Sequence, residues 1–175
     1  MRRIVFFMVI LSLGTYLLAQ ETADVSDGFG QIRLGMSMED AKQALSNDSN
    51  FFYREADLSL VPSTGRPVIE TRGTAFIERA VLQFSDDRLY VFTLILDETR
   101  LDYFSVFSEY RERYGDPVEL DPGLAAWQSE TVRLSLERPL TVRYIDRVTF
   151  AEVVDAGAAG EALQELTREA FLDQL

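Results

Sequence analysis

The 175-residue sequence contains no cysteine and no histidine, and its single lysine is Lys42. Without cysteine and histidine, a Ser-His-Asp or Cys-His catalytic group cannot be assembled, and neither can a zinc site built from these ligands. Disulfides, which stabilise many small extracellular proteins, are excluded as well. The sequence therefore predicts no cofactor, no metal site and a fold that depends on its packed core alone.

Basic charge is also scarce. The chain has 17 basic and 29 acidic residues, a net charge of −12, and loss of the two leader arginines leaves 15 basic residues and a net charge of −14. A protein this acidic is repelled by nucleic acid and by anionic lipid headgroups unless its charges are segregated. Nucleic acid is therefore not predicted as a partner.

The N-terminus has the features of an export signal. Two arginines precede an apolar run over residues 4–18, and Ala19 supplies a small residue at a cleavage position. The run is shorter than the roughly 20 residues that a helix needs to span a bilayer. We predict that residues 1–19 are a signal peptide and that the protein is periplasmic or secreted. The alternative is an uncleaved leader that anchors the protein in the inner membrane, which would be its sole membrane contact.

The rest of the chain is predicted to hold a single domain. Residues 20–28 are small and polar and indicate a flexible lead-in, and residues 29–154 have the apolar patterning of an α+β domain. Residues 155–175 begin with a small-residue linker and end in an amphipathic helix.

Two helices in the domain have clear boundary signals. Ser37, with Asp40 three residues later, is a variant of the capping box and predicts a helix start. Thr99 and Asp102 form a second pattern of this kind, and Gly115 is placed to close the helix that follows.

The strongest strand signal is the hairpin formed by residues 76–84 and 89–96. Apolar residues fall on both faces of the second run, so this strand is central and covered on both sides, or one face is reserved for a partner. Residues 125–128, 131–137 and 140–146 predict a further meander.

The resulting order is helix, hairpin, helix, strands and terminal helix. It indicates an α+β fold in which an antiparallel sheet has its helices packed on one face, followed by a C-terminal helix. A helix-plus-strands unit occurs around residues 30–96 and again around residues 101–147, which suggests two repeats.

The segment GQIRLGMSMEDA, residues 30–41, followed by Leu45, resembles the opening of small bacterial envelope domains of the SmpA/BamE and β-lactamase-inhibitor-protein type. The exit YGDP at residues 114–117, with Trp127 beyond it, is similar to the Gly-x-Pro helix exit and strand tryptophan of such domains. The resemblance implies a non-catalytic protein that binds another envelope protein. The lipidation cysteine of the SmpA/BamE pattern is absent.

Three arginines are candidates for partner binding. Arg133 and Arg143 lie on the predicted wet face of neighbouring strands, and Arg147 lies further along. In so acidic a chain, a row of arginines suits an acidic partner or an anionic glycan. The alternative is ordinary cross-strand ion pairing with Glu137 or nearby acids.

An aromatic stripe marks the second helix. It comprises Tyr103, Phe107, Tyr110 and Tyr114, and the sequence's one tryptophan, Trp127, is expected nearby. These side chains are predicted to pack the helix on the sheet, or to line a groove for an apolar ligand.

The leading functional hypothesis is an exported, non-catalytic protein-binding or assembly module of the periplasm or cell envelope, with another envelope protein as its partner. The alternative is a carrier of a lipid, a peptide or another apolar ligand in a groove between helix and sheet. A third hypothesis is a glycan hydrolase with two catalytic carboxylates, a route open to a protein without histidine or cysteine.

Overall fold

The structure is a computed structural model that describes residues 25–55, 58–60 and 66–158. The predicted signal peptide, its alternative as a membrane anchor, and residues 159–175 of the predicted C-terminal helix lie outside these ranges. Within them, no helix is both long enough and apolar enough to cross a membrane.

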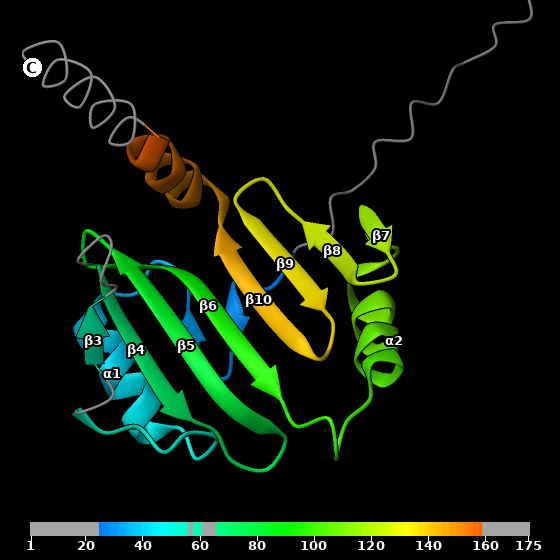
Figure 1. Cartoon of the computed structure of the whole chain (residues 1–175), viewed down its shortest axis with the longest axis horizontal. Helices are drawn as coiled ribbons and strands as arrows, with labels where there is room; N and C mark the ends of the chain where they lie inside the picture. The colour runs from blue at the N-terminus through cyan, green and yellow to red at the C-terminus, as the bar shows by residue number, and fades with distance from the viewer. Residues whose placement is uncertain (1–24, 56–57, 61–65, 159–175) are drawn as a thin grey trace, which may run out of the picture.

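An eight-stranded antiparallel sheet with the order β3-β4-β5-β6-β10-β9-β8-β7 forms the centre of the fold (Figure 1). The strands are β3 (Leu58–Leu60), β4 (Pro67–Arg72), β5 (Ile77–Ser85), β6 (Arg88–Leu96), β7 (Glu119–Asp121), β8 (Leu124–Gln128), β9 (Val132–Glu137) and β10 (Thr141–Asp146). A separate short hairpin, β1 (Gly28–Phe29) with β2 (Ile32–Arg33), precedes the first helix.

The chain repeats one unit of a helix followed by a four-stranded meander. Helix α1 (Met38–Asn47) is followed by β3 to β6, and α2 (Tyr103–Tyr114) by β7 to β10. The last strands of the two units, β6 and β10, pair antiparallel in the middle of the sheet. The predicted α+β fold with an antiparallel sheet and two repeats is therefore confirmed.

Both helices cover the same face of the sheet. Leu45 of α1 and Trp127 of β8, which contacts α2, belong to one hydrophobic core together with Phe92, Leu134 and Tyr144 from the inner strands. Side chains alternate between the two faces of a strand, so the residues between these core positions lie on the opposite face. We call this opposite face, which neither α1 nor α2 covers, the open face.

The start of α1 follows the prediction. The Ser37 hydroxyl accepts a hydrogen bond from the Asp40 amide (3.1 Å) and donates one to the Asp40 carboxylate (2.7 Å). The amide of Met38 donates to the carboxylate of Asp87 (3.0 Å), which lies in the turn between β5 and β6. The first helix is thus fixed to the hairpin of its own repeat.

The start of α2 differs from the prediction. Its N-cap is Asp102, whose carboxylate accepts hydrogen bonds from the amide (2.9 Å) and hydroxyl (2.6 Å) of Ser105. Thr99 instead donates from its amide and its hydroxyl to Asp97. Thr99 and Asp102 are equally suitable caps by sequence. Because Thr99 is already hydrogen-bonded to Asp97, Asp102 caps the helix.

Strand β6 is the predicted central strand, but its side chains do not alternate regularly. A β-bulge at Tyr90, where Gln83 pairs with Val91 and Phe84 with Leu89, places Leu89 in the core and Tyr90 on the open face. There the Tyr90 hydroxyl contacts Gln83 (3.4 Å). Further along the open face, Val91 and Thr93 are only 3% and 8% exposed. The second face of β6 is therefore closed within the monomer and is not the partner surface considered above.

Both ends of the domain differ from the predicted boundaries. Val25 is buried in the core, so the ordered fold begins within the predicted flexible lead-in. Asp146 accepts hydrogen bonds from the amides of Val148 and Thr149 and starts a helix that runs over residues 147–158. Residues 155–158 are therefore helical and not a linker. This helix leaves the end of β10 and extends away from the sheet (Figure 1).

Candidate functional site

The open face of β8, β9 and β10 is where the predicted arginines lie. Val142 and Tyr144 of β10 point into the core, so Arg143 between them points to the open face. In the paired strands Arg143 is opposite Ser135, and Arg133 is opposite Ile145. Alternation and register therefore place Arg133 and Arg143 on the same surface, as the sequence predicts.

This surface contains a groove of about 720 Å³, which we call the arginine groove. The three predicted arginines and Arg138 all contribute to it. Its remaining lining residues are Gly123, Leu124, Gln128, Ser135, Glu137, Ile145 and Phe150. Phe150 comes from the helix that follows β10, so that helix forms one side of the groove.

Two of the arginines pair with carboxylates of the same sheet. Arg143 lies 3.1 Å from Glu137, and Arg133 lies 2.6 Å from Glu119 of the edge strand β7. These contacts agree with the ion-pairing alternative raised from the sequence. Pairing does not bury the guanidinium groups, because the side chains of Arg133 and Arg143 remain 27% and 38% exposed.

The other two arginines are held by groups that carry no negative charge. Arg147 donates to the backbone carbonyls of Ser129 (2.9 Å) and Glu130 (3.0 Å). Arg138 donates to the carbonyl of Pro122 (2.8 Å), and its guanidinium lies 4.4 Å from the ring centre of Tyr103. Neither has a carboxylate within 4.0 Å among the described residues.

The groove thus concentrates positive charge on a strongly acidic protein. Four arginines line it, against one acidic residue, Glu137. Sequence reasoning missed Arg138 because it follows the end of β9, where strand alternation no longer fixes its direction. It also missed Phe150, since only the tertiary structure brings the helix that follows β10 to this edge.

The aromatic stripe of α2 packs against the other face of the sheet. Ring centres lie 6.4 Å apart for Tyr103 and Phe107, 6.0 Å for Phe107 and Trp127, and 5.7 Å for Tyr110 and Trp127. Trp127 is 2% exposed. Burial raises the pKa of Tyr110 and of Tyr144, which share a hydrogen bond, so both phenols stay neutral. The rings themselves fill the space in which an apolar groove was considered.

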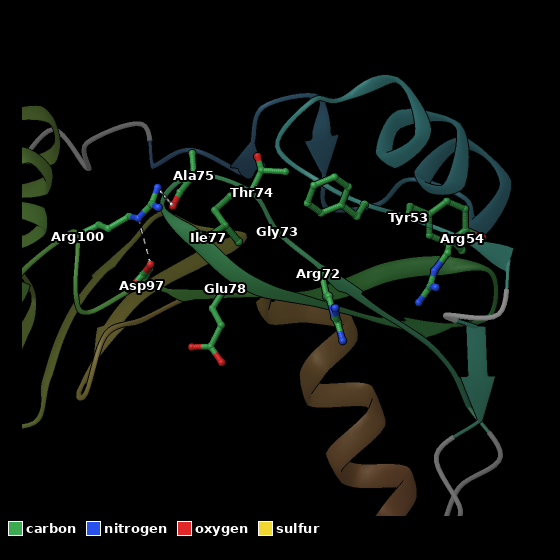
Figure 2. Close-up of a pocket in the computed structure, with 11 residues that line it drawn as sticks. Tyr53, Arg54, Arg72, Gly73, Thr74, Ala75, Ile77, Glu78, Asp97 and Arg100 are labelled. Carbon is green, nitrogen blue, oxygen red and sulfur yellow. Dashed lines mark hydrogen bonds and ion pairs between the residues drawn. The ribbon is translucent and has the colours of Figure 1, made fainter.

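A second hollow of about 590 Å³ lies at the end of the β4–β5 hairpin (Figure 2). Figure 2 shows Arg72 and Glu78 on one side of the hairpin and Tyr53 on the other. Arg100 donates to the Ala75 carbonyl (3.1 Å) and lies 3.4 Å from Asp97. Asp97 and Arg100 are thus tied to each other and to the hairpin turn.

Two carboxyl groups, those of Glu78 and Asp97, line this second hollow. Hydrogen bonds from the side chain and the backbone of Thr99, assisted by Arg100, hold the pKa of Asp97 below its ordinary value. Asp97 is therefore ionised at neutral pH and cannot serve as a general acid there. In the described part of the chain, no three metal-ligating side chains cluster around a common point.

The fold and its surface define a two-repeat α+β domain with an arginine groove on the open face of its sheet. A model of the TP0088 domain family matches residues 27–156, so the chain belongs to this family. No curated protein and no solved structure matches it. The matched segment includes Phe150, so the helix beside the groove is part of the family domain.

Proposed function

We propose that the protein is an exported, non-catalytic binding module of the bacterial cell envelope, which holds another protein against the open face of its sheet. The single observation that carries the proposal is the convergence of Arg133, Arg143 and Arg147 on one groove. The predicted export signal, the absence of histidine and cysteine, and the resemblance to SmpA/BamE-like envelope domains support it.

The geometry favours this function over the other two hypotheses. An apolar carrier needs an unfilled space between α2 and the sheet, where Phe107, Tyr110 and Trp127 are in ring contact. A glycan hydrolase needs two carboxyl groups facing each other across a cleft. The arginine groove is lined by one carboxylate, Glu137, and Arg143 pairs with it.

Photo-crosslinking in intact cells tests the binding proposal. A benzophenone amino acid replaces Phe150 or Leu124 in the groove and, as a matched aromatic control, the exposed Phe104 of α2. We expect both groove positions to give a crosslink to the same envelope protein and Phe104 to give none. Folded protein without a crosslink from either groove position would contradict the proposal.

Fractionation and N-terminal sequencing of the cellular protein test export separately. We expect a periplasmic or secreted product that begins after Ala19. An intact N-terminus in the inner-membrane fraction would instead establish the anchored alternative. Retention in the cytoplasm would contradict export altogether.

A further inference from the structure

We propose that the arginine groove binds a short acidic segment of the partner protein, whose carboxylates meet the guanidinium groups of Arg133, Arg143 and Arg147. This inference rests on the proposed binding module and specifies the chemistry of its partner. It is argued from the charge of the groove, from the way its arginines are held, and from its size and apolar parts.

The charge of the groove is opposite to that of the whole chain. Four arginines and one glutamate line it, whereas the chain carries a net charge of −12. Cationic side chains that were present only for solubility would not need to gather on one concave surface. Charge complementarity of this kind selects an anionic partner and sets its orientation.

The arginines are held in place but keep unused donors. A guanidinium group has five N–H donors, and Arg147 uses one nitrogen to reach two carbonyls, while Arg143 approaches Glu137. Side chains that are already fixed lose less conformational entropy when a ligand binds. Because Arg133 and Arg143 are also partly desolvated, their attraction to an incoming carboxylate exceeds that of fully exposed arginines.

Two carboxylates of the protein already pair with arginines of the groove. Glu137, which lines the groove, lies 3.1 Å from Arg143, and Glu119, which lies outside the lining, is 2.6 Å from Arg133. Planar guanidinium groups can bind carboxylates through two parallel hydrogen bonds. An acidic segment would share or replace these internal carboxylates, so Glu137 acts as a competitor of the partner.

The size of the groove favours a short peptide segment over an extended anionic surface. Its volume of about 720 Å³ is in the range typical of ligand sites, and Leu124, Ile145 and Phe150 provide apolar contacts for neighbouring side chains. A membrane or a nucleic acid would extend past the groove, to where the acidic remainder of the protein repels it over a Debye length of about 8 Å.

Peptide binding to the purified protein tests the inference by fluorescence anisotropy. The probe is a short labelled peptide of alternating glutamate and phenylalanine, compared with its glutamine–phenylalanine and lysine–phenylalanine counterparts. We expect the acidic peptide to bind about ten-fold or more tightly than the glutamine peptide, because charge-assisted hydrogen bonds are replaced by neutral ones. The lysine peptide should bind most weakly.

Three variants test whether the arginine groove is the site that binds the acidic peptide. Arg143→Gln should weaken binding of the acidic peptide by about ten-fold. Glu137→Gln should strengthen it, because the internal competitor loses its charge. Arg79→Gln is the matched control, since Arg79 pairs with Glu70 (2.7 Å) outside the groove and should leave the affinity unchanged. The opposite signs expected for Arg143 and Glu137 separate a specific effect from unfolding.

Equal affinity for the acidic and glutamine peptides would overturn the inference, as would equal losses from Arg143→Gln and Arg79→Gln. Binding to phosphatidylglycerol vesicles that depends on Arg143, without peptide binding, would instead assign the groove to lipid headgroups and overturn it too. A cellular crosslink that persists undiminished in the Arg143→Gln variant would refute the acidic segment but leave the binding module standing. Peptide binding without any cellular crosslink would refute the proposed function as a binding module in the cell, but not the preference of the groove for an acidic segment.

Discussion

The indole nitrogen of Trp127 donates a hydrogen bond of 2.8 Å to the backbone carbonyl oxygen of Gly115. Gly115 is the C-cap of α2, and its amide bonds to the carbonyl of Arg111 (2.9 Å). One tryptophan on β8 therefore both satisfies the end of the helix and packs against its aromatic stripe. The helix exit and the strand tryptophan, which the sequence shows only as two separate features, form a single contact.

Trp127→Phe should lower the free energy of unfolding by about 2 kcal/mol, because it removes the donor to Gly115 and part of a buried ring. Chemical unfolding followed by far-ultraviolet circular dichroism measures this loss without relying on tryptophan fluorescence. Phe104→Leu is the control, since Phe104 is exposed and should change stability by less than about 0.5 kcal/mol. Equal stability of both variants would contradict the role assigned to the hydrogen bond.

Gly115→Ala should cost about 1–3 kcal/mol, because Gly115 has φ 79° and ψ −165°, a region that L-residues avoid. An added Cβ would meet no heavy atom within 4 Å, so the loss would arise from the backbone and not from a clash. Gly157→Ala, in the exposed helix after β10, should instead stabilise that helix by about 0.5–1 kcal/mol. Thermal unfolding of both variants distinguishes the two backbone effects.

Asp102→Ala should destabilise the protein more than Thr99→Ala, because Asp102 caps α2. Hydrogen bonds from the side chain and then the backbone of Ser105 lower the pKa of Asp102 from its ordinary value of 3.8. A carboxyl whose pKa is lower in the folded state stabilises the fold fully above its unfolded pKa, and this stability is lost as the pH falls through the folded value. The difference between the native protein and Asp102→Ala should therefore shrink below about pH 4.

Measurement of this difference by urea unfolding at several pH values provides the test. Thr99→Ala, measured in parallel, shows how much of any change belongs to the neighbouring Asp97 turn. A larger loss from Thr99→Ala at neutral pH would show that the cap assignment is incorrect.

Thr71→Val should raise the free energy of unfolding by about 1 kcal/mol, because the buried Thr71 hydroxyl has no hydrogen-bond partner among the described residues and valine has nearly the same shape. Ser135→Ala provides the contrast. The Ser135 hydroxyl is also buried but donates to Glu137 (2.8 Å), so its removal should cost about 1 kcal/mol. Calorimetric melting curves should move in opposite directions for the two variants.

Several local features could be predicted because neighbouring residues determine them. The Ser37 cap and the Gly115 helix end depend on bonds within a few residues, and both lie where the sequence predicts. The open-face position of Arg133 and Arg143 follows from strand alternation and needs no knowledge of the rest of the fold.

Other features depended on contacts that the sequence does not display. Thr99 and Asp102 have equal capping potential, and the hydrogen bonds of Thr99 to Asp97 decide between them. A bulge in the β5–β6 pairing reverses the facing of Leu89 and Tyr90 relative to regular alternation along β6. Bulges arise from the pairing of two strands, so the pattern of one strand cannot show them.

The sequence by itself determined the exclusion of cysteine and histidine chemistry, the acidic charge, the repeated helix-plus-strands order and the strand face on which two arginines lie. These properties follow from residue types and from short-range periodicity. Only the tertiary structure decided that Arg138, Arg147 and Phe150 join those arginines in one groove. It also decided that the aromatic side chains of α2 pack into the space between that helix and the other face of the sheet. Such convergence depends on strand order, register and helix direction, which are set by the packing of the whole core.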